Sequence, residues 1–79
     1  MKQVKVLLNE VDRIVEFVNI LERANVNADL GQGNIKIDAR SMIGVMTMDT
    51  KNPVTLMINE NDEKADMVLE KIKSYIVEQ

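Results

Sequence analysis

The sequence predicts one α+β domain, residues 1–79, in which helices cover one face of a four-stranded antiparallel sheet. Two observations carry this prediction. Four short segments alternate between apolar and polar residues, as strands with one buried face do. Three other segments repeat their apolar residues at helical spacing. In chain order these segments give β-α-β-β-α-β-α, a two-layer, open-faced sandwich.

The first predicted strand and helix lie at the N-terminal end of the chain. Residues 3–8 alternate and therefore favour a strand, and residues from about 10 to 24 favour an amphipathic helix. The apolar residues that define this helix are Val11, Ile14, Val15, Val18, Leu21 and Ala24. Asn9 is predicted to be the helix N-cap, with Asp12 three residues later as in a capping box.

Two further predicted strands, residues 25–30 and 35–40, are joined by the turn sequence Gly31-Gln32-Gly33-Asn34. Glycine and asparagine tolerate the positive φ angles that tight hairpin turns require. Each of the two segments is apolar on one face only, so we expect them to pair as a hairpin with one buried side.

A short apolar segment, residues 42–48, follows Ser41, which is predicted to cap a short helix. One narrow helical stripe cannot bury all five large side chains of this segment. We expect Val45 and Met48 to pack in the core. The other three, Met42, Ile43 and Met46, are predicted to form a docking surface, because methionine suits adaptable contacts.

The last two predicted elements are a strand over residues 54–59 and a helix that begins near Asn61, which is a good N-cap residue. The helix is predicted to continue to residue 76, because its apolar residues keep helical spacing to that point. These residues are Ala65, Val68, Leu69, Ile72, Tyr75 and Ile76.

Composition excludes several classes of function. Ten basic and thirteen acidic residues give a net charge of −3, which argues against nucleic acid and against an anionic membrane surface as the partner. No apolar stretch approaches the length of a membrane span, and no signal peptide is recognisable. The absence of cysteine, and so of disulfides, favours a reducing compartment. We therefore expect a cytoplasmic protein.

The sequence contains no histidine and no cysteine, which restricts its chemistry further. Ser41 lacks a histidine base, and a metal site would need carboxylates alone. The densest acidic segment, residues 59–63, lacks the spacing of a calcium loop and is interpreted as a turn with a helix cap. We predict no enzyme activity, no metal and no cofactor, and expect a protein-binding domain.

The residues from Ile37 to Met46 resemble the region around the regulatory serine of HPr, the bacterial phosphocarrier protein of the sugar phosphotransferase system. The family pattern there is a strand, a basic residue, Ser, two apolar residues, Gly, Val or Leu, and Met. The predicted element order is also that of HPr. The resemblance implies that Ser41 is a phosphorylation site. It also implies that the methionine-rich surface, rimmed by Arg13, Arg40 and Ser41, binds protein.

The chain departs from HPr where the family carries its phosphate-accepting histidine. An ungapped alignment places Glu10 at that position, and an alignment with one gap, which matches Arg13 to the family arginine, places Val11 there. The first hypothesis is therefore a regulatory, protein-binding HPr-like module without phosphotransfer histidine. Its partner would be a phosphotransferase-system component, HPr kinase or a transcriptional regulator.

Three alternatives remain open at the level of the sequence. Ser41 can be a kinase target that switches the protein. The chain can be an unconventional phosphocarrier that uses Glu10 or Asp12. It can also be a ferredoxin-like ligand-binding domain, although the third helix and the Ser41 motif favour HPr.

Overall fold

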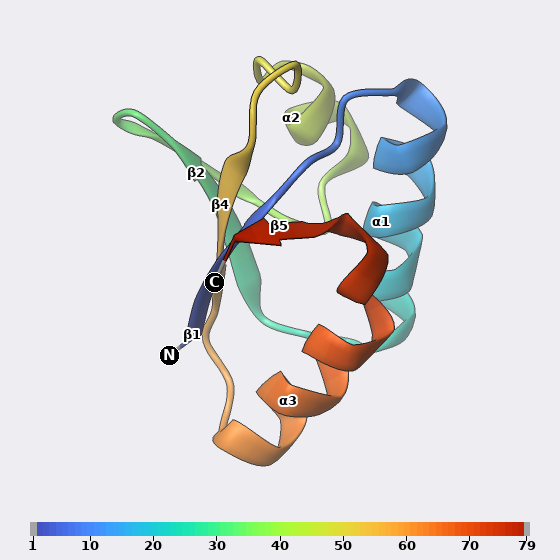
Figure 1. Cartoon of the computed structure of the whole chain (residues 1–79), viewed down its shortest axis with the longest axis vertical. Helices are drawn as coiled ribbons and strands as arrows, with labels where there is room; N and C mark the ends of the chain where they lie inside the picture. The colour runs from blue at the N-terminus through green and yellow to red at the C-terminus, as the bar shows by residue number, and fades with distance from the viewer. Residues whose placement is uncertain (1, 79) are drawn as a thin grey trace.

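The computed structural model describes residues 2–78, and it has helices on one side of an antiparallel sheet, so the predicted α+β class is confirmed (Figure 1). The elements follow in the order β1 (Lys2–Val6), α1 (Val11–Arg23), β2 (Ala28–Gln32), β3 (Ile35–Asp38), α2 (Met42–Met46), β4 (Val54–Ile58), α3 (Asp62–Lys71), a 3₁₀ turn η1 (Lys73–Tyr75) and β5 (Ile76–Glu78).

The sheet has five strands in the order β3-β2-β4-β1-β5, so the prediction of four strands is wrong. All neighbouring strands are antiparallel. The additional strand, β5, pairs with β1, and the backbone of Leu7 donates a hydrogen bond to the carbonyl of Tyr75 just before it. The last helix correspondingly ends at Lys71 and not at residue 76. Tyr75 and Ile76 satisfy helical spacing, but Ile76 has an extended backbone.

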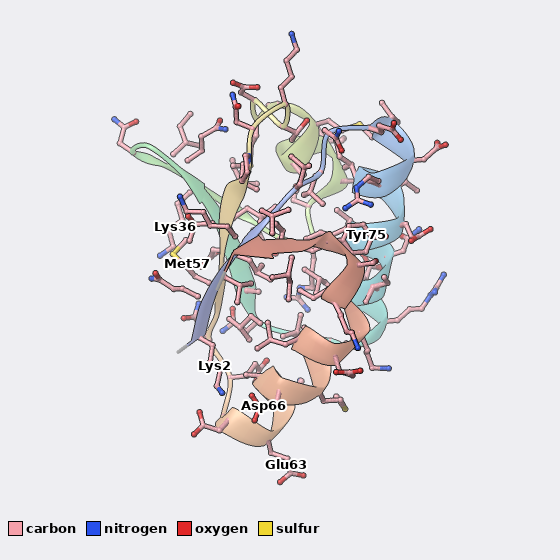
Figure 2. The ribbon with its side chains drawn as sticks, viewed as in Figure 1. Lys2, Lys36, Met57, Glu63, Asp66 and Tyr75 are labelled. Atoms are coloured by element: carbon pink, nitrogen blue, oxygen red, sulfur yellow. The ribbon has the colours of Figure 1, made fainter. Side chains whose placement is uncertain are left out.

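The core lies between the sheet and the helices. Helix α1 buries Ile14, Phe17, Val18 and Leu21 against it. From the sheet come Val4, Val6, Ala28, Leu30, Val54, Leu56 and Ile58. The opposite face of the sheet is open, and Figure 2 shows Lys36 and Met57 on the side away from the helices. This one-sided burial is what the alternation in the strands predicts.

The predicted hairpin turn and one of the two caps described next are confirmed, and the other cap is wrong. Gly33 has φ +60° in the turn between β2 and β3, as the glycine-rich sequence predicts. Asn61 caps α3, with its side chain accepting a hydrogen bond from the Lys64 N–H. The predicted Asn9 cap is wrong. The N-cap of α1 is Glu10, whose side chain makes no capping hydrogen bond, so α1 begins one residue later than expected.

Candidate functional site

Helix α2 is fixed at its start by Ser41 and along one flank by β3. The Ser41 Oγ accepts a hydrogen bond of 3.2 Å from the Gly44 N–H, so the predicted cap is confirmed. A side chain at Gly44 would lie only 2.7 Å from the Ile37 Cγ2 atom and 2.9 Å from the Ser41 Oγ atom. Glycine therefore lets this flank of α2 lie directly against β3.

The apolar side chains of α2 divide between the core and the surface. Val45 and Met48 are buried, as predicted. Met42 is half-buried and packs against the core. Ile43 is 82% exposed and Met46 is 45% exposed, so these two side chains face water.

The exposed side of α2 adjoins one flank of α1. Helix α1 contacts α2, and Met46 lies on the flank of α2 opposite Gly44 and therefore away from β3. On α1, Val11 and Glu22 are eleven residues apart, about three turns, and share one flank. Glu22 lines a hollow together with Ser41, so the C-terminal end of that flank lies near the start of α2. We call the exposed residues Val11, Ile43 and Met46 the α1–α2 patch.

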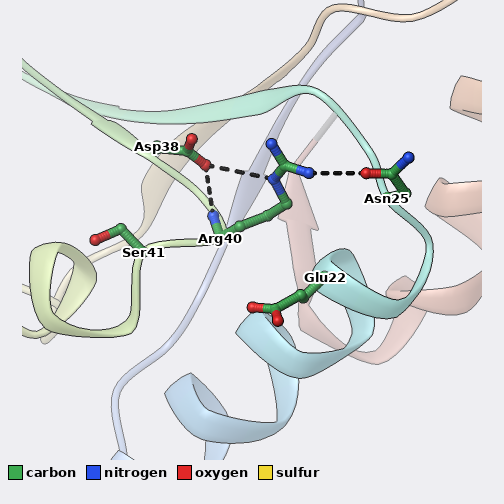
Figure 3. Close-up of a pocket in the computed structure, with 5 residues that line it drawn as sticks. All are labelled: Glu22, Asn25, Asp38, Arg40 and Ser41. Carbon is green, nitrogen blue, oxygen red and sulfur yellow. Dashed lines mark hydrogen bonds and ion pairs between the residues drawn. The ribbon is translucent and has the colours of Figure 1, made fainter.

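The hollow beside Ser41 shows where Arg40 points (Figure 3). The Arg40 guanidinium donates a 3.0 Å hydrogen bond to the Asn25 Oδ1 atom and lies 3.8 Å from the Asp38 carboxylate. Glu22 and Ser41 complete the lining of this hollow of about 390 Å³. Arg40 and Ser41 thus lie on one side of the patch, with the guanidinium already paired.

Arg13 lies on the other flank of α1. Its guanidinium donates hydrogen bonds of 3.0–3.2 Å to the carbonyls of Leu7 and Ser74, and it stacks 4.6 Å above the ring of Tyr75. The structure therefore does not bring Arg13 together with Arg40 and Ser41. Arg13 holds the η1 turn against the start of α1.

The two residues that the predicted alignments place at the HPr histidine lie together at the start of α1. Glu10 is the N-cap residue and is exposed. Val11 is the first residue of the helix and is 64% exposed. Val11 was not predicted as part of the docking surface, which was assigned to residues 42, 43 and 46 alone. Its helical spacing from Glu22, which puts both on one flank of α1, is the sequence feature that could have identified it.

The single tyrosine, Tyr75, is expected to titrate at unusually high pH. Burial, followed by its hydrogen bond to the Glu16 carboxylate, raises the pKa of Tyr75 to about 12. Because this pKa lies above that of the unfolded chain, the stabilisation is complete below about pH 10. It should be lost as the pH rises through about 12. The ultraviolet absorbance of the tyrosinate, followed as the pH is raised, measures the pKa of Tyr75. A titration midpoint of Tyr75 near pH 10 in the folded protein would contradict the assignment. A midpoint in Glu16→Gln that is no lower than in the parent protein would contradict it as well.

Residues 2–78 have neither a carboxylate cluster for a metal ion nor a membrane-spanning helix. No group of three or more carboxylates in this part of the chain is placed to hold a metal ion. No helix of the described residues is both long and apolar enough to cross a membrane.

The element order, the five-stranded antiparallel sheet and the capped helix α2 define an open-faced sandwich of the HPr type. No protein-family model and no curated protein matches the chain. A similar solved structure is that of HPr-C-His from Thermoanaerobacter tengcongensis, with a TM-score of 0.70 and 22% sequence identity. The match covers 94% of this chain and 93% of that one. This likeness shows that the chain has the fold of HPr.

Proposed function

We propose that this chain is a cytoplasmic, HPr-like protein-binding module related to the bacterial phosphotransferase system, and that it acts as a regulator and not as an enzyme. The observation that carries the proposal is the α1–α2 patch. It exposes three large apolar side chains on two helices that contact each other, and one of them, Val11, is at a position that the predicted alignments give to the HPr histidine. Contiguous exposed apolar side chains are typical of protein-binding surfaces.

The absence of an imidazole separates this proposal from phosphocarrier function. We expect no phosphate transfer from phosphoenolpyruvate through enzyme I, because the chain has no histidine. The measurement is incubation of the chain with enzyme I and labelled phosphoenolpyruvate, with an HPr that has its histidine as the positive control. Stable label on Glu10 or Asp12, or label passed on to a sugar-specific component, would establish an unconventional carrier instead.

Binding itself is tested by titrating the isotope-labelled chain with purified partners and recording its amide spectrum. The partners are enzyme I, the sugar-specific components, HPr kinase and transcriptional regulators linked to sugar uptake. The proposal expects at least one of them to bind without transferring phosphate. If none changes the spectrum at concentrations suited to weak association, the link to the phosphotransferase system is wrong.

A second candidate function is a phosphorylation switch at Ser41, favoured by the exposed position of this residue at the start of α2. Phosphorylation would add about two negative charges where the helix dipole favours them. The Arg40 guanidinium would have to leave Asp38 or Asn25 to reach the phosphate. The test is incubation with HPr kinase and labelled ATP. Label that is lost in Ser41→Ala would support the switch, and an unlabelled wild-type chain would exclude HPr kinase as its enzyme.

A further inference from the structure

The α1–α2 patch is bordered by three carboxylates that form no ion pair in the described part of the chain. Glu10 and Asp12 flank Val11 in the chain, and Glu22 lies further along α1 beside Ser41. All three side chains are exposed. We call Glu10, Asp12 and Glu22 the acidic rim.

Three arginines lie near this rim. Arg23 follows Glu22 in the chain and lines a hollow with Asp12, so three carboxylates stand against one guanidinium there and the rim keeps an excess of negative charge. Arg13 is directed to the opposite flank of α1, where it bonds the carbonyls of Leu7 and Ser74. Arg40 shares the hollow with Glu22, but its guanidinium is paired with Asp38 and bonded to Asn25. The surface that a partner meets is thus apolar at its centre and negatively charged at its edge.

From this arrangement we infer that the partner of the α1–α2 patch presents an apolar centre surrounded by lysine or arginine side chains. The inference rests on the proposed docking function and adds the chemistry of the partner to it. Opposite charge around an apolar contact speeds association and rejects partners of the wrong sign. A partner with an acidic rim would bring carboxylates against Glu10, Asp12 and Glu22, and an anionic lipid surface would do the same.

Two synthetic amphipathic helical peptides can serve as probes of this inference. Both carry the same leucine face, and the flanking positions hold lysine in one peptide and glutamate in the other. We expect the lysine peptide to bind roughly tenfold more tightly, since each rim pair adds a modest surface attraction. The difference should shrink at high ionic strength. Amide shifts should be largest at the α1–α2 patch.

Glu22→Lys supplies the variant test, because it should not harm the fold. Glu22 is the penultimate residue of α1, where the helix dipole disfavours a carboxylate and favours a cation. The matched control is Glu70→Lys, which changes the penultimate residue of α3. Glu70 is exposed and pairs only with the exposed Lys73, at 3.6 Å. We expect Glu22→Lys to weaken the lysine peptide about twofold to fivefold. Glu70→Lys should leave its affinity unchanged.

Three results would overturn the inference. One is equal affinity of the two peptides at the patch, which would remove the rim assignment but leave the proposed docking function standing. Another is an equal loss of affinity in Glu22→Lys and Glu70→Lys, which would show attraction by overall charge alone. The last is the absence of amide shifts at the patch with the lysine peptide, when a natural partner does shift those amides.

Discussion

Replacing Ile43 and Met46 together by aspartate is expected to abolish partner binding while leaving the fold intact. Both side chains already face water, so a charge at these positions is not buried in the free protein. In the complex the same charges would be buried without a partner at the centre of the contact. Since central interface residues each carry about 2 kcal/mol or more, the affinity should fall well over tenfold. Binding is measured by titration, and folding by circular dichroism.

The control for this variant changes another exposed isoleucine and another exposed methionine, both outside the patch. Ile35 on β3 and Met67 on α3 are 49% and 48% exposed. Ile35→Asp with Met67→Asp should keep full affinity. Met42→Asp is not suitable as a surface variant, because Met42 packs against the core and its replacement should lower stability. A folded Ile43→Asp, Met46→Asp protein that retains its partner would show that the α1–α2 patch is not the interface.

The second large effect is expected in the core. Phe17 is fully buried in α1, and its ring meets that of Tyr75 edge-on with 5.3 Å between the ring centroids. Phe17→Ala should cost about 3–5 kcal/mol of the free energy of unfolding. A domain of 79 residues has a total of only about 4–12 kcal/mol, so this variant should be largely unfolded or close to unfolding at 25 °C.

Urea unfolding followed by circular dichroism measures the loss. Phe17→Leu is the matched control, because it keeps an apolar side chain and should cost less than Phe17→Ala. If Phe17→Ala unfolded at nearly the same urea concentration as the parent protein, the burial of Phe17 against Tyr75 would not contribute to stability as expected.

Helix caps are signals in which one residue decides one feature, and two of the three predicted caps are confirmed. Ser41 and Asn61 were predicted as caps from their position before a helical segment, and both accept the expected backbone hydrogen bond. In the segment after Ser41, Val45 is buried and Ile43 is exposed as predicted, whereas Met42 packs against the core. These predictions depend only on neighbours in the chain, which the sequence contains.

Features that depend on distant contacts were missed. Strand β5 was not predicted because Tyr75 and Ile76 fit helical spacing. Only the pairing of Ile76 with Val6 shows that Ile76 is in a strand. Arg13 was predicted beside the patch because the resemblance to HPr implies an arginine at its rim. Which flank of a helix meets which neighbour is decided by packing, and here that flank meets the η1 turn.

Docking through the α1–α2 patch is best tested by an amide chemical-shift map of the isotope-labelled chain with a purified protein partner. The largest shifts are expected at Val11, Ile43 and Met46, with no phosphate on the chain. Shifts concentrated on the open face of the sheet, around Lys36 and Met57, would contradict it, because that face lies on the other side of the molecule (Figure 2).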